Sequence, residues 1–189
     1  NLVIEDTTDP IFTTSPASVT VQCSASSEPS ATGTAAASDN CDTSVTVAYA
    51  DSTAAGTGNN SVITRVWTAT DDNSNSTTYT QTITVVDTTD PTFTTSPASV
   101  TVECDAATTT AALGAAVATD NCDDDVTITS TDTTVAGTAN NSVITRVWTA
   151  TDDNSNSLLI GPDGTTKNLA TSHEIDVEIV DIREKPRWF

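Results

Sequence analysis

Apolar and polar residues alternate along several short stretches of the chain. The alternation runs over residues 18–23, 45–49, 61–70 and 79–87, and turns rich in Asp, Asn and Gly separate these stretches. A period of two residues places apolar side chains on one face of a β-strand, and no stretch has the period of a helix. The pattern therefore predicts an all-β fold of short strands, arranged as a β-sandwich.

The strongest predicted strand covers Ser61–Thr70, where apolar residues alternate around Trp67. Trp67 is the largest apolar side chain in this part of the chain, and Trp148 is its counterpart further on. We expect each Trp to form the centre of a core. Arg65 lies on the same strand, and we expect its stem to follow the edge of the sandwich while its charge stays in water.

The whole pattern occurs twice. Asp6–Pro10 reads DTTDP and returns as Asp87–Pro91, and most residues after the first copy recur at the same spacing after the second. A fixed period of this length indicates repeated structural units. Only 4% of the residues are aromatic, so we expect thin cores of Val, Ile and Ala in units that leave much surface wet.

The repeat also predicts the domain boundaries. Leu2–Ile4 precedes the first DTTDP as the last strand of the first repeat precedes the second, and Ile175, Val177 and Ile179 lead into Asp181 in the same way. The expected organisation is a strand of an upstream repeat or an N-terminal strand at 1–5, a first sandwich at 6–86, a second at 87–181 with an elaborated final hairpin at 158–174, and a further joint or C-terminal tail at 182–189.

The chain is strongly acidic, with 26 Asp and Glu against 6 Lys and Arg and a net charge of -20. This balance excludes a nucleic-acid binder that works by neutralising phosphates. It fits a solvated surface protein or one whose carboxylates hold cations. No apolar stretch approaches the length of a membrane-spanning helix, so we expect no membrane span.

Four cysteines fall in two pairs, one in each repeat: Cys23 and Cys41, then Cys104 and Cys122. One disulfide per repeat is the natural interpretation of this even count, and it predicts an oxidising, extracellular compartment. Four free buried thiols are the alternative. The spacing does not match a zinc site, because there is no CxxC and His173 is the only His.

The order of motifs DTTDP, SPASVTV, DNCD and ITRVWTATDD resembles the hyalin-repeat (HYR) domains of bacterial cell-surface and secreted proteins. This resemblance implies two tandem immunoglobulin-like sandwiches, related to fibronectin type III domains, in an elongated array. Many members carry a third Cys in the turn after the last motif, where this chain has Asn73 and Asn154. The resemblance thus leaves Cys23 with Cys41, and Cys104 with Cys122, as the pairs. It implies adhesive or structural roles and no catalytic residues.

In an immunoglobulin-like domain the chain enters at one end. We expect the second strand, the loop into the third strand and the last hairpin turn to meet there. Carboxylates from these segments would repel one another unless a cation joined them, and Ca²⁺ takes six to eight oxygen ligands. The alternative is that these residues cap turns through the backbone. The predicted ligands are Asp6, Asp9, Asp39, Asp42, Asp71, Asp72, Asp87, Asp90, Asp120, Asp123, Asp152 and Asp153.

Enzymatic motifs such as GxSxG, HExxH or a phosphate loop are absent from the sequence. We expect a non-catalytic structural repeat of an extracellular adhesin, stalk or filament, at the cell surface. Its partners would be neighbouring repeats or identical subunits placed end to end, and a surface or glycan ligand stays unidentified. The alternatives are an accessory module of a large secreted hydrolase, and a filament subunit that exchanges Leu2–Ile4 or Ile175–Ile179 as a strand.

Overall fold

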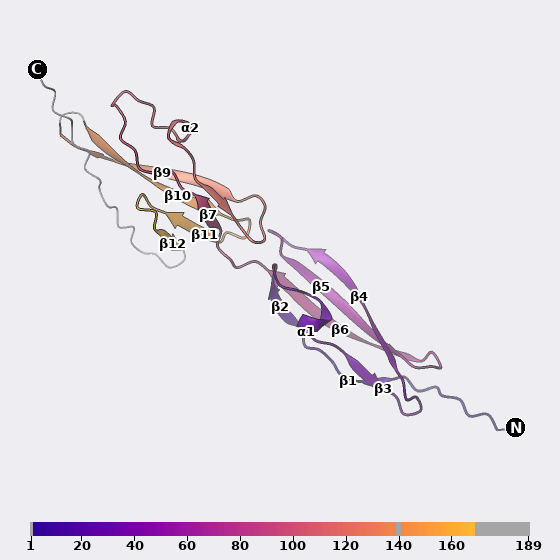
Figure 1. Ribbon diagram of the computed structural model, residues 1–189. Coiled ribbons are helices and arrows are strands. Elements are labelled where there is room, and N and C mark those ends of the chain that lie inside the picture. Colours follow the sequence, from indigo (N-terminus) through magenta and orange to yellow (C-terminus); the bar gives the residue numbers. More distant parts are fainter. Residues whose placement is uncertain (1, 139–140, 169–189) are drawn as a thin grey trace, which may run out of the picture. The chain divides into compact units, whose positions relative to one another are not determined.

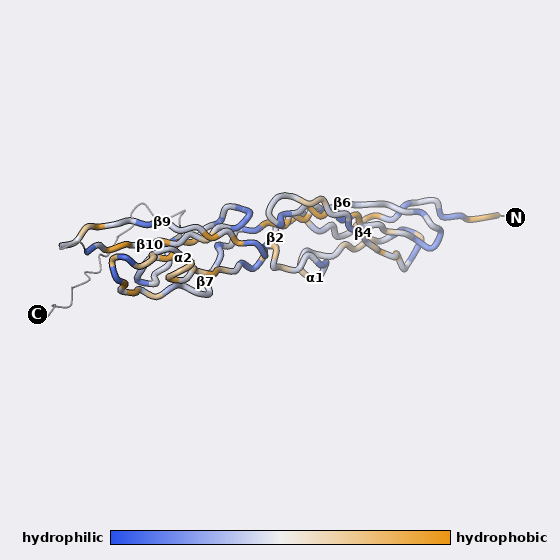
Figure 2. The backbone as a smooth tube through the Cα atoms, turned by 90° about the horizontal axis from the view of Figure 1, so that it is seen from above, coloured by the Kyte–Doolittle hydropathy of each residue, from blue (hydrophilic) through white to orange (hydrophobic). Residues whose placement is uncertain are grey.

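The computed structural model describes residues 2–138 and 141–168 and shows an all-β protein (Figure 1). The chain divides into two compact units, Asn1–Asp87 and Thr88–Phe189. Turns that join the strands are hydrophilic, whereas hydrophobic residues lie along the strands (Figure 2). The predicted strand that contains Ile175, Val177 and Ile179, the predicted joint at 182–189, and His173 lie outside the described residues.

The first unit contains a four-stranded sheet in the order β2-β6-β5-β4 and a two-stranded sheet of β1 and β3. Its elements are β1 (Ile11–Thr14), β2 (Val19–Gln22), α1 (Pro29–Thr32), β3 (Ala36–Ser38), β4 (Thr46–Ala55), β5 (Ser61–Thr70) and β6 (Ser76–Val86). All pairs are antiparallel except β2 with β6, which is parallel and matches Val19–Gln22 to Ile83–Val86. Strand β2 therefore ends beside the end of β6.

The two sheets of the first unit pack on a small core. Trp67 and Ala69 on β5 and Ile83 on β6 are buried, in the alternation that the sequence predicts. The ring of Phe12 on β1 lies 6.0 Å from that of Tyr79 on β6, which joins the two sheets. A single helical turn, α1, begins at Pro29 in the segment between β2 and β3.

Gly33 ends α1 with a φ of 100°, and its N–H donates to the carbonyl of Pro29 at 2.8 Å. A Cβ at this position would come within 2.8 Å of the Cβ of Pro16. Both the backbone conformation and the close approach therefore require glycine here.

The second unit repeats this plan with a four-stranded sheet in the order β12-β11-β10-β9 and a two-stranded sheet of β7 and β8. Its elements are β7 (Thr92–Thr95), α2 (Thr110–Leu113), β8 (Val117–Thr119), β9 (Thr127–Ala136), β10 (Ser142–Thr151), β11 (Ser157–Ile160) and β12 (Thr166–Asn168). Its core joins the two sheets through Trp148, Ile160 and Ala116, against which Phe93 and Ile128 pack.

The units differ at one edge of the four-stranded sheet. Strand β6 continues to Val86, whereas its counterpart β11 stops at Ile160 and turns through Gly161–Gly164 into β12. Residues 100–103, the counterpart of β2, form no strand with any described residue. The insertion that the sequence indicates after Ser157 thus contains a second short hairpin, in which β12 pairs with β11.

Candidate functional site

Three segments of the first unit meet at the end where the chain enters, which we call the proximal end. The side-chain amides of Asn73 and Asn75 donate to the carbonyl of Asp6 at 3.4 and 3.2 Å. The backbone N–H of Asp72 donates to Asp42 Oδ2 at 2.8 Å. The chain before β1, the loop after β3 and the turn between β5 and β6 are therefore tied together at this end.

Asp71 organises the turn between β5 and β6. Its Oδ1 accepts the backbone N–H groups of Asn73 and Asn75 at 2.9 and 2.8 Å, and its Oδ2 accepts the Asn75 side chain at 2.7 Å. Ser74 in the same turn has a φ of 72°. Asp71 is buried and acts as a turn cap, which is the alternative that the sequence left open for these residues.

Asp39 and Asp42 shape the loop after β3 in a similar way. Asp39 Oδ1 accepts the N–H groups of Cys41 and Asp42 at 2.8 and 3.2 Å. Backbone N–H groups of Asp72 and then Ser44 lower the pKa of Asp42, because they favour its charged form. Asp6, Asp39 and Cys41 each offer one potential ligand atom, and these atoms lie within 4.8 Å of one another.

The proximal end of the second unit repeats these contacts at the equivalent positions. Asp152 Oδ1 accepts the N–H groups of Asn154 and Asn156, and Asp123 Oδ2 accepts the N–H of Asp153 at 2.8 Å. Asp120 Oδ1 accepts two backbone N–H groups of its own loop. The same carboxylates therefore hold the same turns in both units.

One carboxylate oxygen of the second unit has no hydrogen-bond partner among the described residues. Asp120 Oδ2 is buried, and no other buried side-chain N or O atom in the described part of the chain lacks a partner. Asp120 and Asp152 place potential ligand oxygens within 4.8 Å of each other. A buried, unpartnered carboxylate oxygen beside a second carboxylate matches the oxygen ligands that Ca²⁺ takes.

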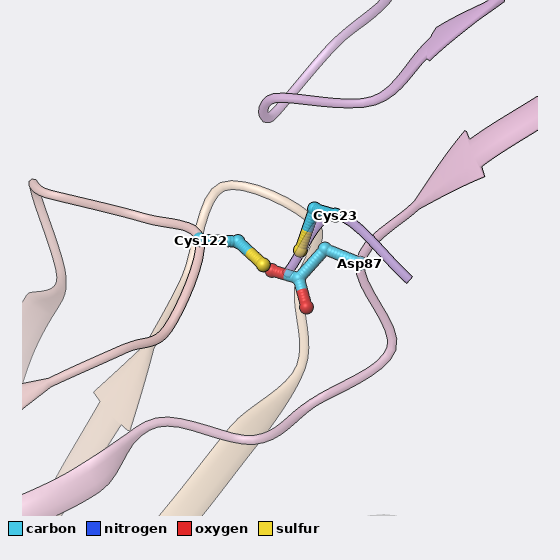
Figure 3. Close-up of side chains that lie close together, drawn as sticks. All are labelled: Cys23, Asp87 and Cys122. Carbon is cyan, nitrogen blue, oxygen red and sulfur yellow. The ribbon is translucent and has the colours of Figure 1, made fainter. Parts of the chain in front are cut away.

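The remaining predicted ligands lie elsewhere or on the surface. Asp9 is exposed, and Asp90 is partly exposed in the second unit. Asp87 is buried at the far end of β6, the distal end of the first unit, where its N–H donates to Asn60 Oδ1 at 2.8 Å. Its carboxylate lies beside Cys23 (Figure 3), with potential ligand atoms within 4.8 Å.

The predicted disulfide within each repeat is wrong. Cys41 and Cys104 are free thiols, whereas Cys23 is disulfide-bonded and so is Cys122. In the first unit the N–H of Cys23 donates to the carbonyl of Val86 at 2.9 Å, so Cys23 lies at the distal end while Cys41 lies at the proximal end. The eleven residues of β6 separate these ends by roughly 30 Å, far beyond the reach of a disulfide.

The free thiol of Cys41 lies in an acidic setting. Partial desolvation, and then the carboxylates of Asp6, Asp39 and Asp71, raise the pKa of this thiol. The side-chain amide of Asn40 also donates to its sulfur at 3.1 Å. The thiol is therefore protonated at neutral pH and is a poor nucleophile, because the thiolate is the reactive form.

The sequence predicts that Arg65 keeps its charge in water, and this prediction is wrong. Its side chain is 1% exposed and forms a two-bond ion pair with Asp51, with N–O distances of 2.8 and 2.7 Å. It also donates to Thr32 Oγ1 and to the carbonyl of Ser27, both at 3.0 Å, and lies 4.6 Å from the centre of the Tyr49 ring. The hydrogen bond to Asp51 raises the pKa of Arg65, so it stays charged inside the unit.

The second unit contains the equivalent ion pair, which is more exposed to solvent. Arg146 donates to both oxygens of Asp132 at 2.7 Å, and its side chain is 17% exposed. The sequence did contain a signal for both pairs, because an Asp precedes each Arg by the same interval and faces it across the hairpin. Alternation alone could not distinguish a buried ionic pair from an exposed one.

The Arg146–Asp132 pair predicts acid sensitivity. The hydrogen bond from Arg146 lowers the pKa of Asp132, so its stabilisation is complete above the ordinary aspartate pKa of about 3.9 and is lost as pH falls through the lower folded-state value. Wild type should therefore melt above Asp132→Asn at neutral pH, and the difference should shrink as the pH falls below the ordinary aspartate pKa of about 3.9. A gap in melting temperature that is constant from neutral to acidic pH would contradict this.

Comparison with known proteins supports the same kind of module. Residues 11–85 match the HYR-like domain with 4 cysteines, and no curated protein matches the chain. Within residues 2–138 and 141–168, no helix is both long and apolar enough to cross a membrane. HYR-like domains are generally non-catalytic, typically extracellular modules with structural or adhesive roles. Residues 11–85 of this chain are therefore similar to an HYR-like domain, and the described residues have an all-β fold.

Proposed function

We propose that the chain is a non-catalytic structural repeat of an extracellular adhesin, stalk or filament, and that Ca²⁺ binds at the proximal end of its units. The proposal of a cation site is supported by Asp120. Its buried Oδ2 lacks a hydrogen-bond partner in the described part of the chain, and its carboxylate lies close to that of Asp152. The net charge of -20 supports it, because a cation would relieve repulsion between carboxylates.

The repeat extends this proposal to the DTTDP segment, which joins one repeat to the next. Asp6 lies close to Asp39 in the first unit, and Asp87 is the counterpart of Asp6 in the second copy of DTTDP. A cation that takes a ligand from the DTTDP segment would restrict the freedom of the segment to pivot. Partners of the chain would then be neighbouring repeats or identical subunits arranged end to end.

The test is calorimetric melting of the full chain, stripped with EDTA and then titrated with Ca²⁺. Ligand that binds only the folded state at 100 times its Kd stabilises by about 2.7 kcal/mol, so a rise in Tm of several degrees is expected. Asp120→Asn should abolish most of the rise for the second unit, because an amide can still cap the loop but is a weaker ligand for the ion.

Asp124→Asn is the matched control. Asp124 is exposed and lies close in sequence to Asp120, so this variant removes the same charge without removing the proposed ligand. It should keep the full response to Ca²⁺. NaCl at equal ionic strength measures general screening. A wild-type Tm that rises no more with Ca²⁺ than with NaCl would refute the cation site and leave the structural role standing.

A further inference from the structure

Strand β4 forms one edge of the four-stranded sheet of the first unit (Figure 1). Among the described residues it pairs only with β5, so every second residue of β4 directs its backbone N–H and C=O away from the sheet. All residues of β4 are exposed except Val47, which is half-buried. A backbone edge of this kind can accept a further strand.

The other strands at the edges of the first unit are short or irregular. Strand β2, at the opposite edge of the same sheet, has four residues, and β1 pairs with β3 through a register shift between Phe12 and Thr14. Proteins protect sheet edges in this way, or with Lys and Pro. Strand β4 has ten residues, contains neither Lys nor Pro, and pairs with β5 without a register shift. Its edge is therefore a long and regular template for another strand.

The charge of β4 favours a second copy of this chain as the source of that strand. Two copies with a net charge of -20 repel each other in general. Asp51 is the one charged residue of β4, and its carboxylate already pairs with Arg65 at 2.7 Å. Two β4 strands can therefore approach each other without bringing unneutralised charges together, and each supplies the edge that the other needs.

We propose that β4 pairs antiparallel with β4 of a second copy, around a two-fold axis at Ala50. Such an axis, at right angles to the sheet, keeps equivalent faces on the same side. Directly opposed residues must then be both even-numbered or both odd-numbered, and the registers that pair most of β4 are centred on Ala50 or on Asp51. The Asp51 register sets two carboxylates opposite each other, which is unfavourable. The Ala50 register sets Asp51 opposite Tyr49 of the second copy.

This register is long enough for a specific interface. Residues 46–54 of the two copies form roughly eight to ten backbone hydrogen bonds, because each closely spaced pair of an antiparallel ladder exchanges two. A typical protein interface contains about ten direct hydrogen bonds. The pairing joins two chains side by side through their first units, so it goes beyond the proposed function and does not depend on it.

Sedimentation equilibrium of the full chain at increasing concentration tests this pairing. A reversible dimer is expected, and its Kd should fall with added NaCl, because salt screens the repulsion between acidic copies. Ala50→Glu and Ala50→Lys each set like charges opposite each other at the axis, so each should raise the Kd more than about tenfold. An equimolar mixture of the two variants should restore the dimer, since the axis then joins opposite charges.

Thr78→Glu is the matched control. Thr78 is exposed on β6, in the interior of the same sheet, so this variant adds the same charge away from the edge and should leave the Kd at high NaCl unchanged. Hydrogen exchange locates the contact, because amides of β4 should exchange more slowly as the concentration rises while those of β6 keep their rates.

Three results would overturn the proposal. The first is a chain that stays monomeric up to millimolar concentration at high NaCl. The second is a dimer that Ala50→Glu and Ala50→Lys leave intact, or that their mixture does not restore, because another surface or register would then join the copies. The third is growth beyond two copies, since a two-fold pairing of β4 closes at the dimer.

Discussion

Replacing Arg65 with methionine should destabilise the first unit by about 1.5–3 kcal/mol, the usual contribution of hydrogen bonds to a charged group, because the exposed Asp51 can be hydrated once its partner is gone. Methionine fills a similar volume but leaves Asp51 without its partner and removes the bonds to Thr32 Oγ1 and the Ser27 carbonyl. Denaturation followed by hydrogen exchange of β5 measures the loss in the first unit, with β10 as the reference.

Two variants sharpen this measurement. Arg65→Met combined with Asp51→Leu should recover much of the loss, because replacing a whole pair by apolar residues is often neutral. Arg146→Met should cost the second unit less, since Arg146 is more exposed and the positions of Tyr49 and Thr32 are occupied there by Ser130 and Leu113. Equal losses for Arg65→Met and Arg146→Met would show that burial of the guanidinium does not set its contribution.

Gln81→Leu should destabilise the first unit by about 2 kcal/mol or more, because it leaves two buried polar groups unpaired at about 1–3 kcal/mol each. Gln81 is fully buried, and its amide nitrogen donates to the carbonyls of Ala17 and Thr32 at 2.9 Å, while its oxygen accepts the indole N–H of Trp67 at 3.3 Å. Leucine keeps the volume but can neither donate nor accept these bonds. Chemical denaturation of the full chain measures the change.

Thr80→Val is the matched control for Gln81→Leu. Thr80 is exposed on the same strand, and valine keeps a β-branched side chain, so the change should stay within about 0.5 kcal/mol. If the two variants lost similar stability, the Gln81 contacts would contribute little and strand propensity would explain the loss.

Much of the fold follows from the sequence because its signals are local. Alternation around Trp67 and the Asp-Asn turn after Thr70 specify the β5–β6 hairpin, and the DTTDP repeat indicates the second copy. The turn contacts of Asp71 are also local, so residue type alone suggested them. Features that depend only on neighbours in the chain were within reach of sequence reasoning.

Features that depend on distant pairing were not. The prediction placed the end of the second strand at the proximal end, but β2 pairs in parallel with β6 and ends at the distal end. Because β2 runs parallel to β6, Cys23 and Cys41 lie at opposite ends of the first unit and do not form the predicted disulfide. The prediction that Arg65 keeps its charge in water was wrong for the same kind of reason, because its burial depends on α1 and on Asp51 across the hairpin.

The parallel contact between β2 and β6 also determines how the first unit carries tension. The chain enters β2 from the proximal side and leaves β6 on the distal side, so a pull on the two termini of the unit slides these strands lengthwise past each other. The backbone bonds between Val19–Gln22 and Ile83–Val86, with that from Cys23 to Val86, are then loaded together in shear. Bonds loaded together must break nearly at once, whereas an antiparallel hairpin pulled from its open end opens one bond at a time. Forced unfolding is governed by the unfolding rate, so this short patch is the mechanical clamp of the first unit.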